Sequence, residues 1–365
     1  MCLLLEGINF TGEALKDIGS KYLERRLPYN CGDEDTNGIL IPPEIILPNE
    51  TIVTVRYKRK SPWTVDIKNG KIVLKKDNKI ITPVSFPIRP SYYGKMLSTK
   101  VYCENVVTKY SVHNLGFFTP RDCYFFKIGL QCKFCSLEPT KNRDPSMVNF
   151  INPHVALEAA GMAFENDKSI KNIVWSGGTY KNFDYGVIYL ARLISEVNKV
   201  KPPNVQHHVF IMPPHNFEIL KTLKKVGVNS ITFSLEIFDK KLFESICPGK
   251  FKLYGHKRFF EVMEYAVEIF GYDNVSCNFI AGLESLDSLL KGFESVAKIG
   301  VKPSVPIFHP DPGTEFENKP PPSFSYIFKM AKKLYEIYKE WGFKPILYKA
   351  RGASLDCEIY EGWFK

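Results

Sequence analysis

The sequence has no long hydrophobic run, no export signal and no sign of a disulfide framework. No segment approaches the roughly 18 apolar residues that a membrane-spanning helix needs, and the opening MCLLLEG is too short and lacks a basic flank for a signal peptide. Nine cysteines are an odd number, which argues against paired disulfides in a chain without such a signal. With 44% hydrophobic and 24% charged residues, the chain is also neither disordered nor fibrous. These absences predict a cytoplasmic enzyme or binding protein.

Acidic residues are fewer than basic ones, 39 against 49, so the formal net charge is +10. Such a balance suits an acidic partner: nucleic acid, a phosphorylated substrate or an acidic electron-donor protein. The lysines are scattered, however, and no block of five like charges occurs. Solvated faces are therefore the favoured interpretation, and nucleic acid is kept as an alternative.

The first 105 residues are typical of an α+β accessory region. A helix is predicted over residues 11–26, capped by Thr11, because apolar side chains recur there at helical spacing. A small β unit follows over residues 51–76, where Asn69-Gly70 is a strong hairpin turn.

From residue 106 the pattern changes to short apolar runs that alternate with amphipathic stretches. Such alternation predicts parallel β/α units, here an α/β fold with a partial (β/α)6 TIM-like barrel whose site lies at the carboxyl ends of the strands. The domain boundaries follow as 1–105 for the accessory region, 106–323 for the barrel, and 324–365 for a C-terminal helix (324–341) and tail. The strand candidates are residues 110–118, 171–177, 205–211, 229–236, 274–282 and 302–309, and helices are predicted over 155–166, 185–200, 216–227 and 256–271.

Three cysteines lie together in DCYFFKIGLQCKFCS, directly after the first barrel strand. Cys123 and Cys132 have eight residues between them, and Cys132 and Cys135 have two. Three thiolates fit an iron–sulfur cubane with one open iron better than a structural zinc site, which needs four closed ligands. A non-catalytic zinc module that adds Cys103 stays as the alternative. The other six cysteines, Cys247 among them, stand alone in the sequence.

This cluster resembles that of the radical S-adenosylmethionine (radical SAM) enzymes, and the chain is most similar to their biotin-synthase-related branch. The usual family spacing is three residues and then two, so the longer first gap is a departure, whereas the terminal Cys-x-aromatic-Cys with Phe134 is retained. The resemblance extends over residues 107–320 and implies a [4Fe–4S] cluster held by Cys123, Cys132 and Cys135.

Further segments resemble the family's SAM-binding elements and follow in family order after successive strands. The Ser176-Gly177-Gly178-Thr179 turn implies a bare backbone beside the SAM amino group. The remaining implied contacts are Ser234 and Glu236 for the ribose, Arg258 for the carboxylate, Ile280 for the adenine, and a Pro-Gly-Thr corner at 312–314.

The resemblance implies that one electron enters the cluster, that SAM is cleaved to a 5′-deoxyadenosyl radical, and that this radical abstracts hydrogen from a small organic substrate. It also implies a ferredoxin or flavodoxin donor. Cofactor biosynthesis in an anaerobic organism is expected, for example of the iron-guanylylpyridinol cofactor of iron hydrogenase. RNA-modifying and methyl-transferring radical SAM enzymes are the alternatives. His309 at the sixth strand is the catalytic candidate, and Cys277 is either a small buried residue or a second cluster ligand.

Overall fold

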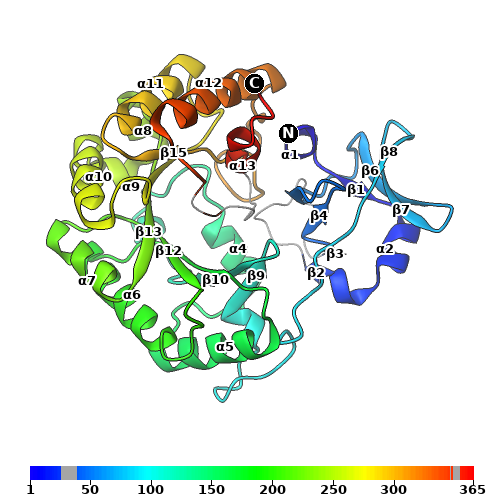
Figure 1. Cartoon of the computed structure of the whole chain (residues 1–365), viewed down its shortest axis with the longest axis horizontal. Coiled ribbons are helices and arrows are strands. Elements are labelled where there is room, and N and C mark those ends of the chain that lie inside the picture. Colours follow the sequence, from blue (N-terminus) through cyan, green and yellow to red (C-terminus); the bar gives the residue numbers. More distant parts are fainter. Residues whose placement is uncertain (26–38, 346, 348–353) are drawn as a thin grey trace.

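A seven-stranded sheet curves through the larger part of the molecule, and a smaller β unit from the N-terminal region lies beside it (Figure 1). The computed structural model describes residues 1–25, 39–345, 347 and 354–365. In the large sheet, β9 and β10 are antiparallel, and every neighbouring pair from β10 to β15 is parallel and in chain order. Six parallel strands in this order confirm the predicted α/β class and partial (β/α)6 barrel. The strands are β9 Val107–Tyr110, β10 Asn114–Phe118, β11 Asn172–Ser176, β12 Gln206–Ile211, β13 Val228–Glu236, β14 Val275–Phe279 and β15 Lys302–Ser304.

Helices follow the strands and cover the outer face of the barrel (Figure 1). Several begin where a polar side chain caps the first turn: Asn182 accepts from the backbone of Tyr185 at α6, and Ser323 from that of Tyr326 at α12. The helices are α3 Tyr124–Lys127, α4 Leu137–Arg143, α5 Pro153–Asn166, α6 Phe183–Val197, η4 Phe217–Ile219, α7 Leu220–Lys225, α8 Lys240–Ile246, α9 Pro248–Leu253, α10 His256–Phe270, α11 Leu286–Ala297, α12 Phe324–Trp341 and α13 Asp356–Tyr360.

The N-terminal region packs against the end of the sixth barrel strand. The guanidinium of Arg56 donates hydrogen bonds to the carbonyl of Leu4 at 2.7 Å and to that of Ile307 at 3.3 Å. The α13 helix lies between this region and the barrel (Figure 1), and Asp356 on it accepts from Ser304 of β15 at 2.6 Å. The elements of the region are α1 Cys2–Glu6, β1 Asn9–Phe10, α2 Gly12–Ile18, η1 Ser20–Tyr22, β2 Glu24–Arg25, β3 Leu40–Ile41, β4 Glu44–Ile46, β5 Ile52–Thr54, β6 Trp63–Lys68, β7 Lys71–Lys76, β8 Lys79–Pro83 and η3 Cys103–Asn105.

Three predicted elements are shorter in the structure than in the sequence analysis. The first helix stops at Ile18, because Gly19 follows with a φ of 75°. The strand predicted over residues 110–118 is divided by a turn in which Ser111 is left-handed. The last barrel strand ends at Ser304, and an isolated bridge between Ile307 and Ala281 follows it.

Alternation along β14 decides which side chains face the helices. Phe279 packs on Phe293 of α11, with ring centroids 5.7 Å apart, so Cys277, two residues earlier, also faces outward. Cys277 is fully buried there as a small core residue and is not a second cluster ligand. Among the described residues, no helix is both long and apolar enough to cross a membrane.

The inward-facing side chains in the middle of the barrel are polar. Ring atoms of His208 lie 2.7 Å from the hydroxyl of Ser230 and 2.9 Å from that of Thr232, which in turn lies 2.5 Å from Ser276. His207 faces the other way and accepts from the indole of Trp175 at 3.0 Å. Both histidines are buried and hydrogen-bonded, and burial lowers the pKa of each to about 3.

These two histidines predict that acid weakens the fold. The pKa of each is about 3 in the folded chain, against 6.5 for an unperturbed histidine in the unfolded chain. Between these two pH values the unfolded chain binds more protons than the folded chain. The free energy of unfolding therefore falls as the pH drops from 6.5 toward 3. When the pH is lowered from 7 to 5, each histidine should reduce the free energy of unfolding by about 2 kcal/mol, measured by urea denaturation. His208→Gln should flatten this dependence, and His154→Gln, an exposed control, should not. An unchanged slope in His208→Gln would contradict the assignment.

Candidate functional site

The three clustered cysteines lie on the loop that follows β10. Cys123 precedes α3, and a turn closed by the bond from the Cys135 N–H to the Cys132 carbonyl, 3.0 Å, brings the other two together. Burial raises the pKa of Cys135, and the nearby sulfurs of Cys132 and Cys123 raise it further. Burial likewise raises the pKa of Cys123, with a contribution from Cys132. The three thiols therefore interact with one another across the eight-residue gap.

A helical turn and a backbone contact accommodate that gap. The α3 helix takes up its first half, and the second half lies against the junction of α8 and α9. There the Gly249 N–H donates to the Leu130 carbonyl and the Lys133 N–H donates to the Ile246 carbonyl, both at 3.0 Å. A β-carbon on Gly249 would lie 2.6 Å from the Leu130 oxygen, so only glycine permits this approach.

Cys247 stands beside Cys132, although the sequence analysis left it as an isolated cysteine. A hydrogen bond between the two thiols is the largest influence on Cys132 and lowers its pKa. Burial raises the pKa of Cys247, as does this hydrogen bond. Cys247 is fully buried, and 111 residues lie between it and Cys135 in the sequence. No local spacing signal relates the two segments, which explains why the sequence analysis missed it.

Ser234, Glu236 and Ile280 come together at the ends of β13 and β14 around a buried lysine. The ammonium of Lys250 donates to the Ser234 carbonyl at 2.6 Å and pairs with Glu236 at 2.9 Å. The Ile280 N–H donates to the Glu236 carbonyl at 2.9 Å. Burial opposes the charge of Lys250, but Glu236, Cys132 and Cys247 together raise its pKa. Lys250, on α9, is thus the cation next to the cysteines.

Arg258 does not lie beside the cysteines. Its guanidinium lies over the ring of Phe217 at 4.7 Å and that of Tyr254 at 5.7 Å, and donates to the carbonyl of His215. Its side chain is 39% exposed, on the helix that follows α9. The aromatic rings of the outer layer hold it, so the structure does not bring Arg258 to the other predicted site residues.

The Gly177-Gly178 turn packs on the backbone of the cysteine loop. The Gly178 N–H donates to the Pro120 carbonyl at 2.6 Å, and the Thr179 carbonyl accepts from the Tyr124 N–H at 2.8 Å. A β-carbon on Gly178 would lie 2.8 Å from the Cys123 Cα and closer still to the Asp122 carbonyl. The close approach that requires glycine is therefore made to the loop that carries Cys123.

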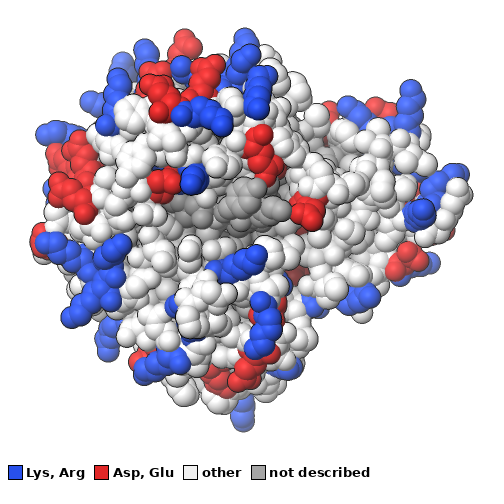
Figure 2. Space-filling view, viewed as in Figure 1, with Lys and Arg blue, Asp and Glu red and all other residues white. Residues whose placement is uncertain are grey.

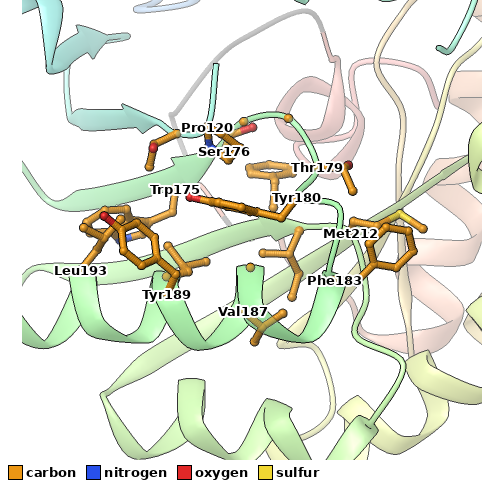
Figure 3. Close-up of a pocket in the computed structure, with 17 residues that line it drawn as sticks. Pro120, Trp175, Ser176, Thr179, Tyr180, Phe183, Val187, Tyr189, Leu193 and Met212 are labelled. Carbon is orange, nitrogen blue, oxygen red and sulfur yellow. The ribbon is translucent and has the colours of Figure 1, made fainter. Parts of the chain in front are cut away.

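A small pocket opens beside this turn, between the Ser176–Tyr180 segment and α6 (Figure 3). Its lining includes Trp175, Tyr180, Phe183, Val187 and Tyr189. Because Trp175 faces the helices, this pocket is on the outer side of the sheet and is separate from the barrel interior.

His309 is linked to the cysteine motif through a carboxylate. Its Nδ1 lies 2.5 Å from one oxygen of Asp311, and Ser136, the residue after Cys135, donates to the other oxygen at 2.6 Å. His309 and Asp311 are largely buried, with 12% and 3% of their side chains exposed. The carboxylate fixes the ring and its tautomer, an arrangement suited to proton transfer.

Three thiols on one loop match the number of protein ligands that an iron–sulfur cubane with one open iron needs. Within the described part of the chain, no three His, Cys, Asp or Glu side chains are grouped closely enough to hold one metal ion. Cys103, the fourth ligand of the zinc alternative, hydrogen-bonds Ala159 on α5, and no other cysteine affects its pKa, which burial raises to about 12. Thiolates around a cubane bind different irons and so stand further apart. Phe134, between Cys132 and Cys135 in the sequence, is partly buried and packs against the hydrophobic core. Cys31 lies outside the described residues.

Gly178→Ala should therefore damage the cysteine loop itself. The added methyl group collides with backbone atoms, which cannot rotate away, at a cost of about 1–3 kcal/mol. We expect a lower urea midpoint and less iron bound per chain after anaerobic reconstitution. Gly12→Ala is the matched control, because nothing lies within 4 Å of its β-carbon position. Normal iron content in Gly178→Ala would show that the turn does not support the loop.

Comparison with known proteins assigns this domain. Residues 129–291 match the model of the radical SAM superfamily, a range that includes Cys132 and Cys135 and begins after Cys123. Over 129 residues the chain is 33% identical to the bacteriochlorophyllide c C-7(1)-hydroxylase of Chlorobaculum limnaeum. That match covers 35% of this chain and 32% of the relative, about a third of its length.

Several solved structures show a weak overall likeness to this chain, and two of the three named here are radical SAM enzymes by title. The [FeFe]-hydrogenase maturase HydG from Carboxydothermus hydrogenoformans is 18% identical, with a TM-score of 0.44 over 65% of this chain and 54% of that one. The coproporphyrinogen III oxidase HemN from Escherichia coli is 14% identical, with a TM-score of 0.44 over 70% and 58%. A radical SAM methyltransferase from Sphaerobacter thermophilus is 13% identical, with a TM-score of 0.45 over 81% and 82%. Residues 129–291 are thus identified as a radical SAM domain, and enzymes with this domain use a [4Fe–4S] cluster and SAM.

Proposed function

We propose that this chain cleaves SAM reductively and abstracts hydrogen from a small organic substrate. When bound, a [4Fe–4S] cluster on Cys123, Cys132 and Cys135 with SAM would supply the electron and the 5′-deoxyadenosyl radical for this chemistry. The observation that carries the proposal is the mutual influence of the three thiols at the mouth of a parallel barrel, next to the buried Lys250–Glu236 pair.

The residues of this chain would bind and orient SAM. Lys250 holds the Glu236 carboxylate by one oxygen, Oε1, in position for a ribose hydroxyl. Lys250 also takes the place that the sequence analysis gave to Arg258 as the cation for the SAM carboxylate. The other proposed SAM contacts are Ser176, Thr179 and Ile280. The backbone of each is hydrogen-bonded to a segment that carries another residue of the proposed site. His309 would hold or move a proton at Nε2, since its Nδ1 faces Asp311.

The substrate is proposed as an organic molecule in cofactor or pigment biosynthesis. The relative in Chlorobaculum limnaeum is named for hydroxylating a bacteriochlorophyllide, which supports an organic ring system as the substrate class. The iron-guanylylpyridinol cofactor of iron hydrogenase remains the specific prediction from the sequence. The polar lining formed by His208, Thr232 and Ser276 lies in the barrel interior below the site and suits polar substituents on such a molecule.

The proposed electron donor is a small acidic protein such as a ferredoxin or flavodoxin. The net charge of +10 favours encounter with an acidic partner, at a rate that salt should reduce. On the face shown in Figure 2, lysines and arginines are interspersed with acidic residues and form no continuous basic surface. This distribution favours a protein donor over the extended basic groove that nucleic acid needs.

The cysteine assignment predicts the cofactor content. Cys123→Ala, Cys132→Ala and Cys135→Ala should each lose the brown colour of the anaerobic protein and its formation of 5′-deoxyadenosine from SAM with dithionite, because the cubane needs all three thiolates. Cys2→Ala should keep both. Iron and sulfide that persist without Cys123 would move the ligand role to another cysteine. S-adenosylhomocysteine in place of 5′-deoxyadenosine would indicate methyl transfer, and a colourless protein with zinc would indicate a structural module.

The contacts around Lys250 predict which residues bind SAM. Glu236→Gln removes a charged hydrogen-bond partner at the site and should weaken SAM binding about tenfold or more, measured by anaerobic equilibrium dialysis with labelled SAM. Arg258→Ala should leave SAM affinity unchanged, because its guanidinium is held by Phe217, Tyr254 and His215. The reverse result, with affinity lost only in Arg258→Ala, would restore the arginine to the site.

A further inference from the structure

The contact between the cysteine loop and the α8–α9 junction places two cysteines next to each other. Its two backbone hydrogen bonds run from the Gly249 N–H to the Leu130 carbonyl and from the Lys133 N–H to the Ile246 carbonyl, both at 3.0 Å. The second bond joins the residue after Cys132 to the residue before Cys247. The main chains of the two cysteines are therefore neighbours.

A disulfide spans Cα atoms about 4.4–6.8 Å apart, so it forms only between residues whose main chains are neighbours, as those of Cys132 and Cys247 are. Each of these two thiols also shifts the pKa of the other. Cys247 is the largest influence on the pKa of Cys132, whereas Cys135 is not among the main ones. Cys247 is therefore better placed than Cys135 as a partner for Cys132, although Cys135 is nearer in sequence.

We propose that Cys247 is a resolving cysteine, which forms a disulfide with Cys132 whenever the cluster is absent and a low-molecular-weight disulfide is present. Cys132 is the partly exposed member of the pair and meets the oxidant, while Cys247 is fully buried behind it. The closed pair cannot offer the Cys132 sulfur to iron. It protects the empty site from irreversible oxidation until a reductant opens it.

The reaction balances as two successive thiol–disulfide exchanges. The Cys132 sulfur attacks one sulfur of oxidised glutathione, the S–S bond of glutathione breaks, and one glutathione leaves as its thiol. The Cys247 sulfur then attacks the Cys132 sulfur and displaces the second glutathione. The two protein thiols are oxidised, one glutathione disulfide is reduced to two thiols, and the two protein protons pass to the leaving sulfurs.

Peptide mapping of the cluster-free protein tests this directly. Trypsin cuts after Lys133 and so places Cys132 in residues 128–133 and Cys135 in residues 134–141, while Cys247 falls in residues 242–250. After anaerobic treatment with oxidised glutathione, the non-reduced digest should contain 128–133 joined to 242–250, and dithiothreitol should release it. Joining of 128–133 to 134–141 instead, or glutathione on Cys132 without any link, would overturn the proposal.

Two variants and a control test whether Cys247 is the partner of Cys132. Cys135→Ser removes the competing thiol and should keep the link, whereas Cys247→Ser should abolish it. Cys103→Ser changes another fully buried cysteine and should leave the link intact. If the link is missing from Cys135→Ser as well as from the wild type, the proposal fails even where Cys247→Ser does not fold.

The consequence for iron loading rests on the proposed function, whereas the disulfide itself does not. Oxidised protein should take up little iron and sulfide until dithiothreitol is added, after which loading should return to that of the untreated protein. A confirmed Cys132–Cys247 link together with undiminished loading would refute the cluster assignment of Cys132 and leave the disulfide standing.

Discussion

The rest of the site depends on the short antiparallel contact between the cysteine loop and the α8–α9 junction. Two backbone hydrogen bonds form it, donated by the N–H groups of Gly249 and Lys133. Both contacting segments carry side chains of the proposed site. The segment on one side carries Cys132, and the segment on the other side carries Cys247 and Lys250. Without it, the long gap after Cys123 would leave the three thiols on a loop with no fixed shape, and ordering them would cost the entropy of that loop.

Close backbone approach makes this arrangement rigid. Gly178 meets the Asp122–Cys123 backbone on one side of the loop, and Gly249 meets Leu130 on the other. Neither position tolerates a β-carbon: the atoms opposite Gly178 are all main chain, and those opposite Gly249 are the Leu130 carbonyl oxygen and the buried ring of Phe125. The cysteine loop is thus held between two glycines that come from different β/α units, which positions its thiols more firmly than a free loop could.

Charge at the site is buried as a pair, and the layer below is neutral. Lys250 and Glu236 compensate each other, with about a tenth of each side chain exposed. Deeper in the barrel, His208 stays uncharged at neutral pH, because burial lowers its pKa and hydroxyl groups satisfy its ring. A neutral polar interior avoids the cost of an isolated buried charge and still offers hydrogen bonds to a substrate.

The sequence by itself determined the local features of this protein. Alternating strands and helices, the capped start of α12 at Ser323 and the order of motifs along the chain all depend on neighbouring residues, and so the barrel and the cysteine triple could be predicted. Only the tertiary structure decided which distant residues join that triple. Lys250 and not Arg258 lies beside the cysteines, and Cys247 lies beside Cys132. The sequence could not reveal this, because contacts between segments more than a hundred residues apart leave no local periodicity or spacing to detect.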